Sequence, residues 1–212
     1  MKYFKPLFLA LLIFSCSNKD KGRWQQHVSY KMVIDVDAEG RSYVGTQELV
    51  YTNNSPDTIS RVFYHLYFNA FKPGSEMQVR ASEINDDDRS ISKKILSLDR
   101  KDYGDVRVLE LLQDGAVLDI KNQETILEAS LKEPLLPGEK TTLSMRFKVN
   151  VPQQIRRSGK DSEDGVAFSM AQWYPKLCEY DSQGWHANAY IGREFFGVWG
   201  DFDVTINIDK NY

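Results

Sequence analysis

Apolar and polar residues alternate along most of this chain, in short runs separated by turn-forming residues. The clearest run covers residues 141–151, where every second side chain from Leu143 onward is apolar. An alternation with a period of two places the apolar side chains on one face of a strand and the polar ones on the other. A Pro-Gly pair at 137–138 precedes the run, and Pro152 ends it because proline has no backbone N–H to donate. This run therefore predicts a strand with one buried face.

The same alternation recurs often enough to predict the fold class. Further strands are expected at residues 27–38, 42–54, 59–68, 91–98, 107–112, 117–121, 125–131, 166–170 and 202–208. No segment carries a long, capped pattern with the 3.6-residue period of a helix. The polar stretches 77–90 and 153–165 are expected to be exposed loops. Many short strands joined by turns predict an all-β fold, either a sandwich or a barrel.

The beginning of the chain predicts export. Two lysines precede an apolar run at 7–14, which is too short for a membrane-spanning helix but has the length of a signal-peptide core. Cys16 follows in a sequence that resembles the bacterial lipobox, in which the cysteine becomes acylated. We therefore expect a lipoprotein signal peptide over 1–15, a lipidated Cys16, a polar tether over 16–23, and a location on a bacterial cell-envelope membrane. The alternative is an ordinary secretory signal with an incidental cysteine.

The rest of the chain, residues 24–212, is long enough for one domain with a sizeable core. Over the whole chain, the 27 basic and 30 acidic residues are interspersed and give a net charge of −3. No basic stripe is present, which argues against a nucleic-acid partner. Cys178 is the only cysteine after Cys16, so an internal disulfide in the mature domain is excluded.

The residue types that carry chemistry do not form a recognisable catalytic or metal site. The three histidines are His27, His65 and His186, and none belongs to an HExxH sequence. His65 lies in an expected strand and is predicted to be packed and hydrogen-bonded. The acidic run at 86–88 is expected to be solvated, because the ligand spacing of a calcium loop is absent. No catalytic residue and no metal ligand are therefore expected, and the chain alone is not expected to be an enzyme.

Aromatic residues concentrate between residues 167 and 203. Trp173, Trp185 and Trp199 are three of the four tryptophans in the chain. Aromatic side chains that are interleaved with polar ones often line a cleft or an interface. The alternative is that these side chains fill the core of the sandwich.

This segment resembles the aminopeptidase N family of zinc metallopeptidases, the gluzincins, and in particular a bacterial branch with exported members. The matching motifs occur in order: an opening strand at 30–36, a strand and turn at 45–57, a strand at 63–66, Leu-Pro-Gly-Glu at 136–139, an aromatic-Pro step at 173–175, Tyr-Asp at 180–181 and Trp-Gly-Asp-Phe-Asp-Val at 199–204. The resemblance covers about residues 24–212. It implies the N-terminal domain of such an enzyme, a saddle-like, mostly antiparallel β-sandwich.

The resemblance also implies a partner and a substrate site. In the family the zinc ligands lie in a following catalytic domain, so zinc is expected in that absent domain and no cofactor in this chain. The chain is then a fragment or a truncated paralogue whose partner is the catalytic domain. N-terminal domains of this family contribute a glutamine or glutamate that binds the substrate's free α-amine. Gln172 is the candidate for binding a peptide N-terminus, with Trp173 and Tyr174 as the apolar wall.

Two other functions remain open. A free-standing cell-surface module could bind a peptide or a glycan through Trp173, Trp185 and Trp199, and it would group them on one exposed platform. A spacer between the anchor and another domain is the third interpretation. The docking interpretation predicts instead an exposed apolar face larger than roughly a few hundred Å².

Overall fold

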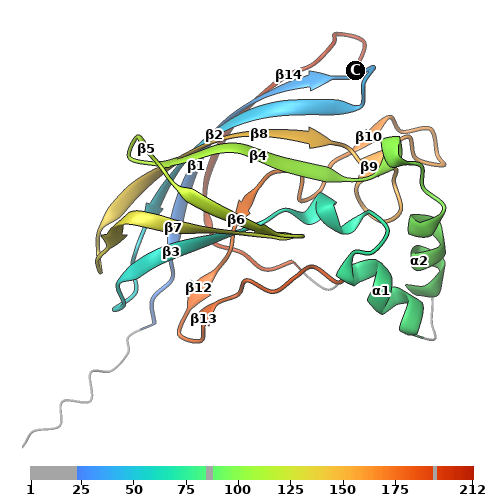
Figure 1. Ribbon diagram of the computed structural model, residues 1–212. Helices are drawn as coiled ribbons and strands as arrows, with labels where there is room; N and C mark the ends of the chain where they lie inside the picture. The colour runs from blue at the N-terminus through green and yellow to red at the C-terminus, as the bar shows by residue number, and fades with distance from the viewer. Residues whose placement is uncertain (1–22, 85–87, 193–194) are drawn as a thin grey trace, which may run out of the picture.

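The computed structural model describes residues 23–84, 88–192 and 195–212. The expected signal peptide, the lipidation site Cys16, nearly all of the tether and two aspartates of the acidic run lie outside the described residues. The described part forms two β-sheets that pack face to face, with two short helices beside one end of the sandwich (Figure 1). The predicted all-β sandwich is confirmed.

The larger sheet has six strands in the order β14-β1-β2-β8-β4-β5. Their bounds are His27–Asp37 for β1, Ser42–Thr52 for β2, Asp105–Gln113 for β4, Ala116–Val117 for β5, Lys140–Asn150 for β8 and Gly200–Asn207 for β14. All neighbours are antiparallel except β1 and β14, which run parallel. β14 therefore lies at the edge of this sheet.

The second sheet has four strands in the order β11-β3-β7-β6. Their bounds are Ile59–His65 for β3, Asp119–Gln123 for β6, Ile126–Leu135 for β7 and Lys176–Leu177 for β11. Two short strand pairs lie apart from both sheets: β9 (Gly159–Lys160) with β10 (Phe168–Ser169), and β12 (Tyr180–Asp181) with β13 (Gly184–Trp185).

The core lies between the two sheets and follows the predicted alternation. On β8 the inward residues from Leu143 to Val149 are at most 2% exposed, and the partly exposed and exposed residues between them point outward. Burying each large apolar side chain of this kind stabilises the fold by about 1.5–3 kcal/mol. Gly45 on β2 is required by this packing, because a Cβ there would lie 2.4 Å from the Phe147 ring and 2.8 Å from Ile34 Cδ1.

The helices correct two sequence predictions. Residues 91–98 were expected to form a strand but mostly belong to helix α2 (Asp88–Leu96), and the expected loop 77–90 contains most of α1 (Glu76–Glu83). Ser75 caps α1 because its Oγ accepts a hydrogen bond from the Gln78 backbone N–H at 3.2 Å. The Gln78 amide then donates to Ser92 Oγ at 3.1 Å and joins the two helices.

Short 3₁₀ turns complete this end of the molecule. They are η1 (Tyr67–Ala70) and η2 (Arg100–Asp102). The helices and η1 bury a second, smaller apolar cluster beside the main core. Its members are Tyr67, Ala70, Phe71, Met77, Ile95 and Tyr190. Two helices of eight and nine residues depend on this tertiary packing, since isolated helices of this length are marginal in water.

The stretch 153–165, predicted as an exposed loop, is partly buried. It contains β9, and Lys160 on that strand is only 6% exposed. The Lys160 Nζ lies 3.1 Å from Asp102 Oδ1 and donates to the Lys101 carbonyl oxygen at 3.0 Å. Lys160 can be buried because its charge is paired and hydrogen-bonded. The prediction of an exposed loop relied on the polarity of the residues alone and could not anticipate this pairing.

Candidate functional site

Gln172 lies at the small cavity next to the helical end of the sandwich. It has a φ of 55°, which is uncommon for a residue other than glycine. The cavity has a volume of about 60 Å³. It is lined by Tyr67, Phe68, Phe71, Arg156, Arg157, Ser158, Ala171, Gln172, Tyr190, Gly192 and Phe195. A space of this size holds one or two water molecules or an ammonium group, and it is too small for a whole amino-acid residue.

Lys176 is the residue near Gln172 that sequence reasoning missed. Its Nζ lies 3.4 Å from Gln172 Oε1, so the amide oxygen already faces an ammonium group of the same chain. The Lys176 stem passes beneath Gly197, where a Cβ would lie 2.3 Å from Lys176 Cε. Burial lowers the pKa of Lys176, and the nearby Cys178 and Glu179 partly oppose this shift. In the sequence, the only signal for Lys176 was its position within a segment rich in aromatic residues.

Trp173 and Tyr174 lie on the other side of the same segment. The Tyr43 hydroxyl donates to the Trp173 carbonyl oxygen, and the two rings are 6.2 Å apart. Tyr174 contacts Tyr30 at 5.5 Å and Phe202 at 6.2 Å between ring centroids, and burial raises the pKa of Tyr174 to about 12. The structure therefore places Trp173 and Tyr174 against the core and β14, while Gln172 lines a different cavity.

The strand β14 carries an apolar row that the described residues cover only in part. The row consists of Phe202, Val204, Ile206 and, directly after the strand, Ile208, and these side chains are 38–55% exposed. We call these four residues the β14 apolar row. In the parallel register their β1 neighbours are Tyr30, Met32 and Ile34, all at most 3% exposed. The apolar side chains that face the core are therefore buried on β1, whereas their neighbours on the edge strand β14 are exposed.

An apolar cavity opens beneath this row. It has a volume of about 170 Å³. It is lined by Ile34, Val36, Tyr43, Phe168, Met170, Trp173, Ile206 and Ile208. Its lining is almost wholly apolar, so it offers a partner hydrophobic contact and no chemistry of its own.

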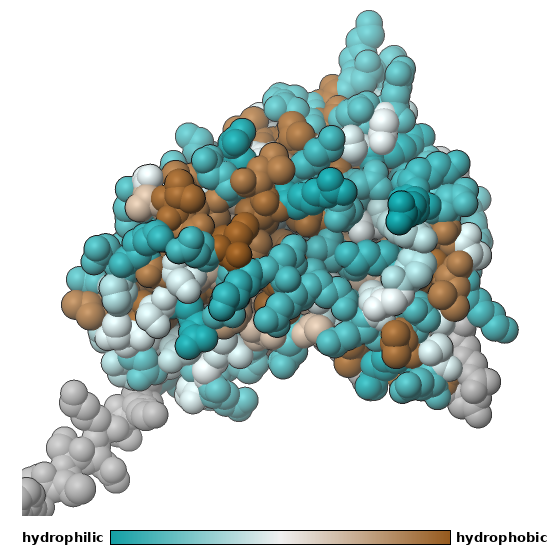
Figure 2. Space-filling view, in the orientation of Figure 1, coloured by the Kyte–Doolittle hydropathy of each residue, from teal (hydrophilic) through white to brown (hydrophobic). Residues whose placement is uncertain are grey.

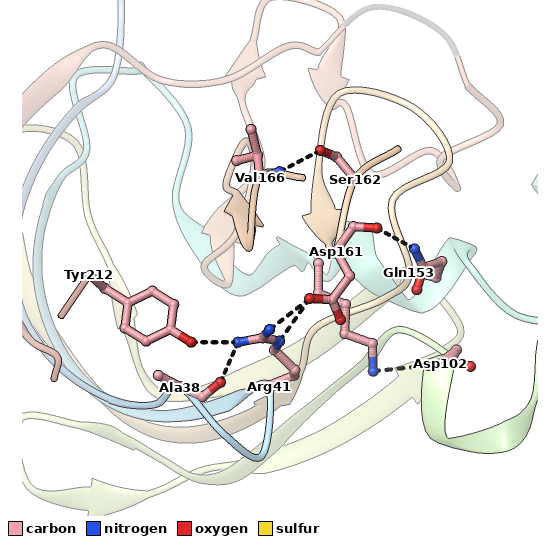
Figure 3. Close-up of polar contacts among 9 residues, drawn as sticks. Ala38, Arg41, Asp102, Gln153, Asp161, Ser162, Val166 and Tyr212 are labelled. Atoms are coloured by element: carbon pink, nitrogen blue, oxygen red, sulfur yellow. Dashed lines mark hydrogen bonds and ion pairs between the residues drawn. The ribbon is translucent and has the colours of Figure 1, made fainter. Parts of the chain in front are cut away.

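Arg41 makes polar contacts with separate parts of the chain, including Tyr212 in the segment after β14 (Figure 3). Its Nη2 lies 2.7 Å from Asp161 Oδ1, and its Nη1 donates to the Ala38 carbonyl oxygen at 2.6 Å and to Tyr212 Oη at 3.1 Å. The guanidinium also lies 5.2 Å from the centre of the Phe168 ring. Arg41 therefore joins the β1–β2 turn, the loop before β10 and the residues after β14 around one side of the cavity.

Further apolar side chains are exposed at the opposite edge of the large sheet, on β4 and β5, and on β6, which is an edge strand of the second sheet. Figure 2 shows them gathered on the viewed face over β4, β5 and β6. The exposed large apolar residues of these strands are Leu109, Val117 and Ile120, at 55%, 61% and 37%. Leu109 lies where the pairing of β4 with β8 shifts register. The sandwich is therefore incompletely covered at both edges of its large sheet.

The three tryptophans of the platform hypothesis differ in their surroundings. Trp185 is half-buried and contacts the rings of Tyr51, Phe63 and Tyr180 at 5.2–6.4 Å. Trp173 is also half-buried, as described above. Trp199 alone of the three is strongly exposed, at 79%. Core packing accounts for the first two, so the three residues do not form one exposed platform.

The described residues offer no assembled catalytic group. No three His, Cys, Asp or Glu side chains among them lie close enough together to hold a metal ion. His27 lies 3.3 Å from Asp201 and His186 lies 2.8 Å from Asp181. Cys178 is buried, and its burial raises the pKa of the thiol. A neutral, buried thiol is a poor nucleophile. Within residues 23–84, 88–192 and 195–212 no helix has the length and apolar character to cross a membrane.

Comparison with known proteins gives a distant structural match only. No protein-family model matches the sequence, and no curated protein matches it either. A variant of a two-domain M1 zinc metallopeptidase bound to L-tryptophan matches with a TM-score of 0.43 and 18% identity over 72% of this chain and 28% of that chain. The M1 zinc metallopeptidase from Deinococcus radiodurans matches with a TM-score of 0.40 and 16% identity over 70% and 26%. The chain thus spans little more than a quarter of these proteins, and similarity at this level assigns neither a family nor an activity.

Proposed function

We propose that this chain is the non-catalytic N-terminal domain of an exported, lipid-anchored zinc aminopeptidase-like metallopeptidase, and that it docks against a catalytic domain. The observation that carries the proposal is the β14 apolar row, which continues the buried face of β1 into solvent. Apolar side chains in strict register with a core row gain their stabilisation when a partner removes them from water. The cavity beneath the row gives such a partner a recess to fill.

The placement of the family-like motifs is consistent with this role. Leu-Pro-Gly-Glu at 136–139 forms the turn between β7 and β8, and the sequence 53–57 forms the turn between β2 and β3. Trp-Gly-Asp-Phe-Asp-Val at 199–204 begins β14. These three positions, two turns between strands and the start of an edge strand, support the proposal. In the full enzyme the catalytic domain would supply the zinc, and lipidated Cys16 would hold the assembly at a cell-envelope membrane.

The docking role is tested by charge placed on either side of β14. Val204→Lys and Ile206→Lys put a lysine into the β14 apolar row, and Thr205→Lys is the matched control because residue 205 alternates to the opposite face. The chain is combined with the catalytic domain encoded in the same reading frame, and complex formation and aminopeptidase activity are measured. We expect both row variants to weaken association and the control to retain it. Equal binding by all three variants, or a reading frame without an HExxH sequence, would contradict the proposal.

Gln172 is proposed as a ligand for the substrate's α-ammonium group. The proposal is supported by the Lys176 ammonium group, which lies 3.4 Å from the Gln172 amide oxygen, because an amide oxygen can accept a hydrogen bond from an ammonium group. Lys176 would have to move aside or share the oxygen, so Lys176→Met is expected to lower KM for peptide substrates. Gln172→Ala is expected to raise KM. An unchanged kcat/KM for Gln172→Ala in the two-domain protein would remove Gln172 from the site.

A free-standing module that binds a peptide or a glycan is the second candidate function, because of one surface pocket. It has a volume of about 550 Å³. It is lined by Arg23, Trp24, Gln25, Glu179, Asp181, Phe196, Gly197 and Trp199. Exposed aromatic rings beside carboxylates suit a glycan or a peptide side chain. Binding of a peptide or glycan that Trp199→Ala abolishes, with unchanged thermal stability, would favour this candidate.

A further inference from the structure

A basic pocket lies at the end of the sandwich where β4 begins, and the proposed docking role does not use it. The pocket has a volume of about 460 Å³, which is within the range of small-molecule sites. Three separate segments of the chain contribute its four cationic residues, which are Lys72, Arg100, Lys101 and Arg107. Among the described residues that line the pocket, Asp105 alone is acidic. The pocket is therefore basic although the whole chain has a net charge of −3, and we call it the β4 basic pocket.

Most of these cations are accessible and unpaired. Arg100 and Lys101 are exposed and Lys72 is partly exposed, so their long side chains can reach a ligand in the pocket. In the described part of the chain, none of these three residues takes part in an ion pair. Arg107 pairs with Asp105, yet its side chain remains 73% exposed. An anion in the pocket would therefore meet three cations that no described carboxylate neutralises.

A fifth cation lies beside the pocket. Lys148 on β8 is exposed and lies directly opposite Arg107 in the antiparallel register of β4 and β8. Like charges directly opposite each other on neighbouring strands destabilise a sheet. The ion pair with Asp105 offsets only one of these two charges. An anion close to both cations would relieve their repulsion, which is a second observation that points to an anionic ligand.

Hydrogen bonds hold the backbone of the pocket in place. The Lys101 carbonyl oxygen accepts from Asn150 Nδ2 at 3.2 Å and from Lys160 Nζ at 3.0 Å. A Cβ at Gly104 would lie 2.0 Å from the Phe68 carbonyl oxygen, so only glycine fits at this position. The segment that carries the two cations of η2 is therefore fixed before a ligand arrives, which reduces the entropy lost on binding.

We propose that the β4 basic pocket binds a small soluble anion with two or more negative charges, of the organic phosphate or polyphosphate class. Arginine and lysine bind phosphate oxygens through charge-assisted hydrogen bonds. Several cations around one pocket favour a multivalent anion over a monovalent one, because each added charge gains a further attraction. The phosphate of a lipid headgroup offers the same chemistry, so the position of the pocket has to distinguish the two sources.

The position of the pocket favours a soluble ligand. Asp105 pairs with Asn150, Asn150 with Ser42, and Ser42 with Asp37, the last residue of β1. The pocket therefore lies at the opposite end of the large sheet from His27, where β1 begins. The 11 residues of β1 span about 35 Å. A tether that precedes β1 would hold the pocket away from the anchoring membrane, and this step alone rests on the proposed lipid anchor.

The test titrates tripolyphosphate into the full chain by isothermal titration calorimetry, with acetate as the monovalent comparison. We expect tripolyphosphate to bind, acetate to give no measurable binding, and the affinity for tripolyphosphate to fall as salt is added. Arg100→Gln and Lys148→Gln each remove one exposed cation and should weaken binding about two- to fivefold, and together about tenfold. Lys140→Gln is the matched control, because Lys140 is exposed on the same face of β8 at its other end.

The outcomes separate a built site from general surface charge and from a lipid. Exposed substitutions of this kind should leave the thermal midpoint nearly unchanged, so weaker binding reports on the pocket and not on folding. The proposal is overturned if tripolyphosphate does not bind, or if Lys140→Gln weakens binding as much as Lys148→Gln. Vesicles that contain phosphatidylglycerol form the second arm. Vesicle binding that Arg100→Gln and Lys148→Gln weaken would overturn the assignment to a soluble anion. Failure of the docking experiment would not affect these results, because the β4 basic pocket includes no residue of the β14 apolar row.

Discussion

Protonation of His65 should destabilise the fold in mildly acidic solution. The pKa of His65 falls from 6.5 in an unfolded chain to about 4 in the folded one, chiefly because the ring is buried. A lowered pKa means that the unfolded chain binds the proton first, so stability is complete above about pH 6.5 and is lost as the pH falls towards 4. At 1.36 kcal/mol for each pH unit of difference, the loss from His65 is about 2 kcal/mol between about pH 7.5 and pH 5.

Two other titratable groups lie near His65. Burial lowers the pKa of Lys176. Burial raises the pKa of Glu179, which acts in the opposite sense because protonation of that carboxyl favours the folded chain. The contribution of His65 is therefore isolated by comparing variants, not by the pH profile of the natural chain alone.

The measurement is urea unfolding at several pH values for the natural chain, His65→Phe and His27→Phe. We expect the free energy of unfolding of the natural chain and of His27→Phe to fall in parallel as the pH is lowered. His65→Phe should lose about 2 kcal/mol less over the same interval. Identical pH dependence of His65→Phe and the natural chain would refute the argument that His65 is buried and neutral.

Three further changes test the packing and the anchor. Gly45→Ala should cost about 1–3 kcal/mol of stability in urea unfolding, because the added Cβ meets the Phe147 ring; a variant as stable as the natural chain would contradict the packing. Lys160→Met leaves Asp102 without its ion-pair partner and should cost about 3 kcal/mol, whereas Lys140→Met on an exposed position should leave the thermal midpoint nearly unchanged. Cys16→Ala should abolish incorporation of labelled fatty acid in cells, and retained labelling would rule out Cys16 as the anchor.

Most of the long strands could be predicted from the sequence, whereas the helices and the two-residue strands β9, β11, β12 and β13 could not, for a physical reason. Alternation over residues 141–151 reproduces β8 to within one residue at each end, because one face of that strand is buried along its whole length. α2 is short, and Ile91 and Ile95, four residues apart, fit a helical face as well as part of an alternating pattern. Its helical form depends on the contact between Gln78 and Ser92, which are distant from each other in sequence. Tertiary contacts therefore decided what the local pattern left ambiguous.

The predicted site shows the same limit at the level of single residues. Gln172, Trp173 and Tyr174 are adjacent in sequence, which suggested one cleft. The positive φ of Gln172 turns the backbone there, and the three side chains end in two different environments. The burial of Lys176 and His65 depends on neighbours that are distant in the sequence. Such features carry no short-range signature, so they could be found only from the structure.

β14 connects these observations. Its residues alternate as regularly as those of β8, yet its apolar row is 38–55% exposed, whereas the β1 residues alongside are at most 3% exposed. Alternation stabilises a strand fully only when the apolar face is covered, because each partly exposed large side chain forgoes part of the about 1.5–3 kcal/mol that full burial contributes. A sequence selected for a solvent-exposed edge would place charged residues on both faces. The proposed docking role rests on the β14 apolar row, so substitutions on its two faces, Val204→Lys against Thr205→Lys, are the sharpest test of that role.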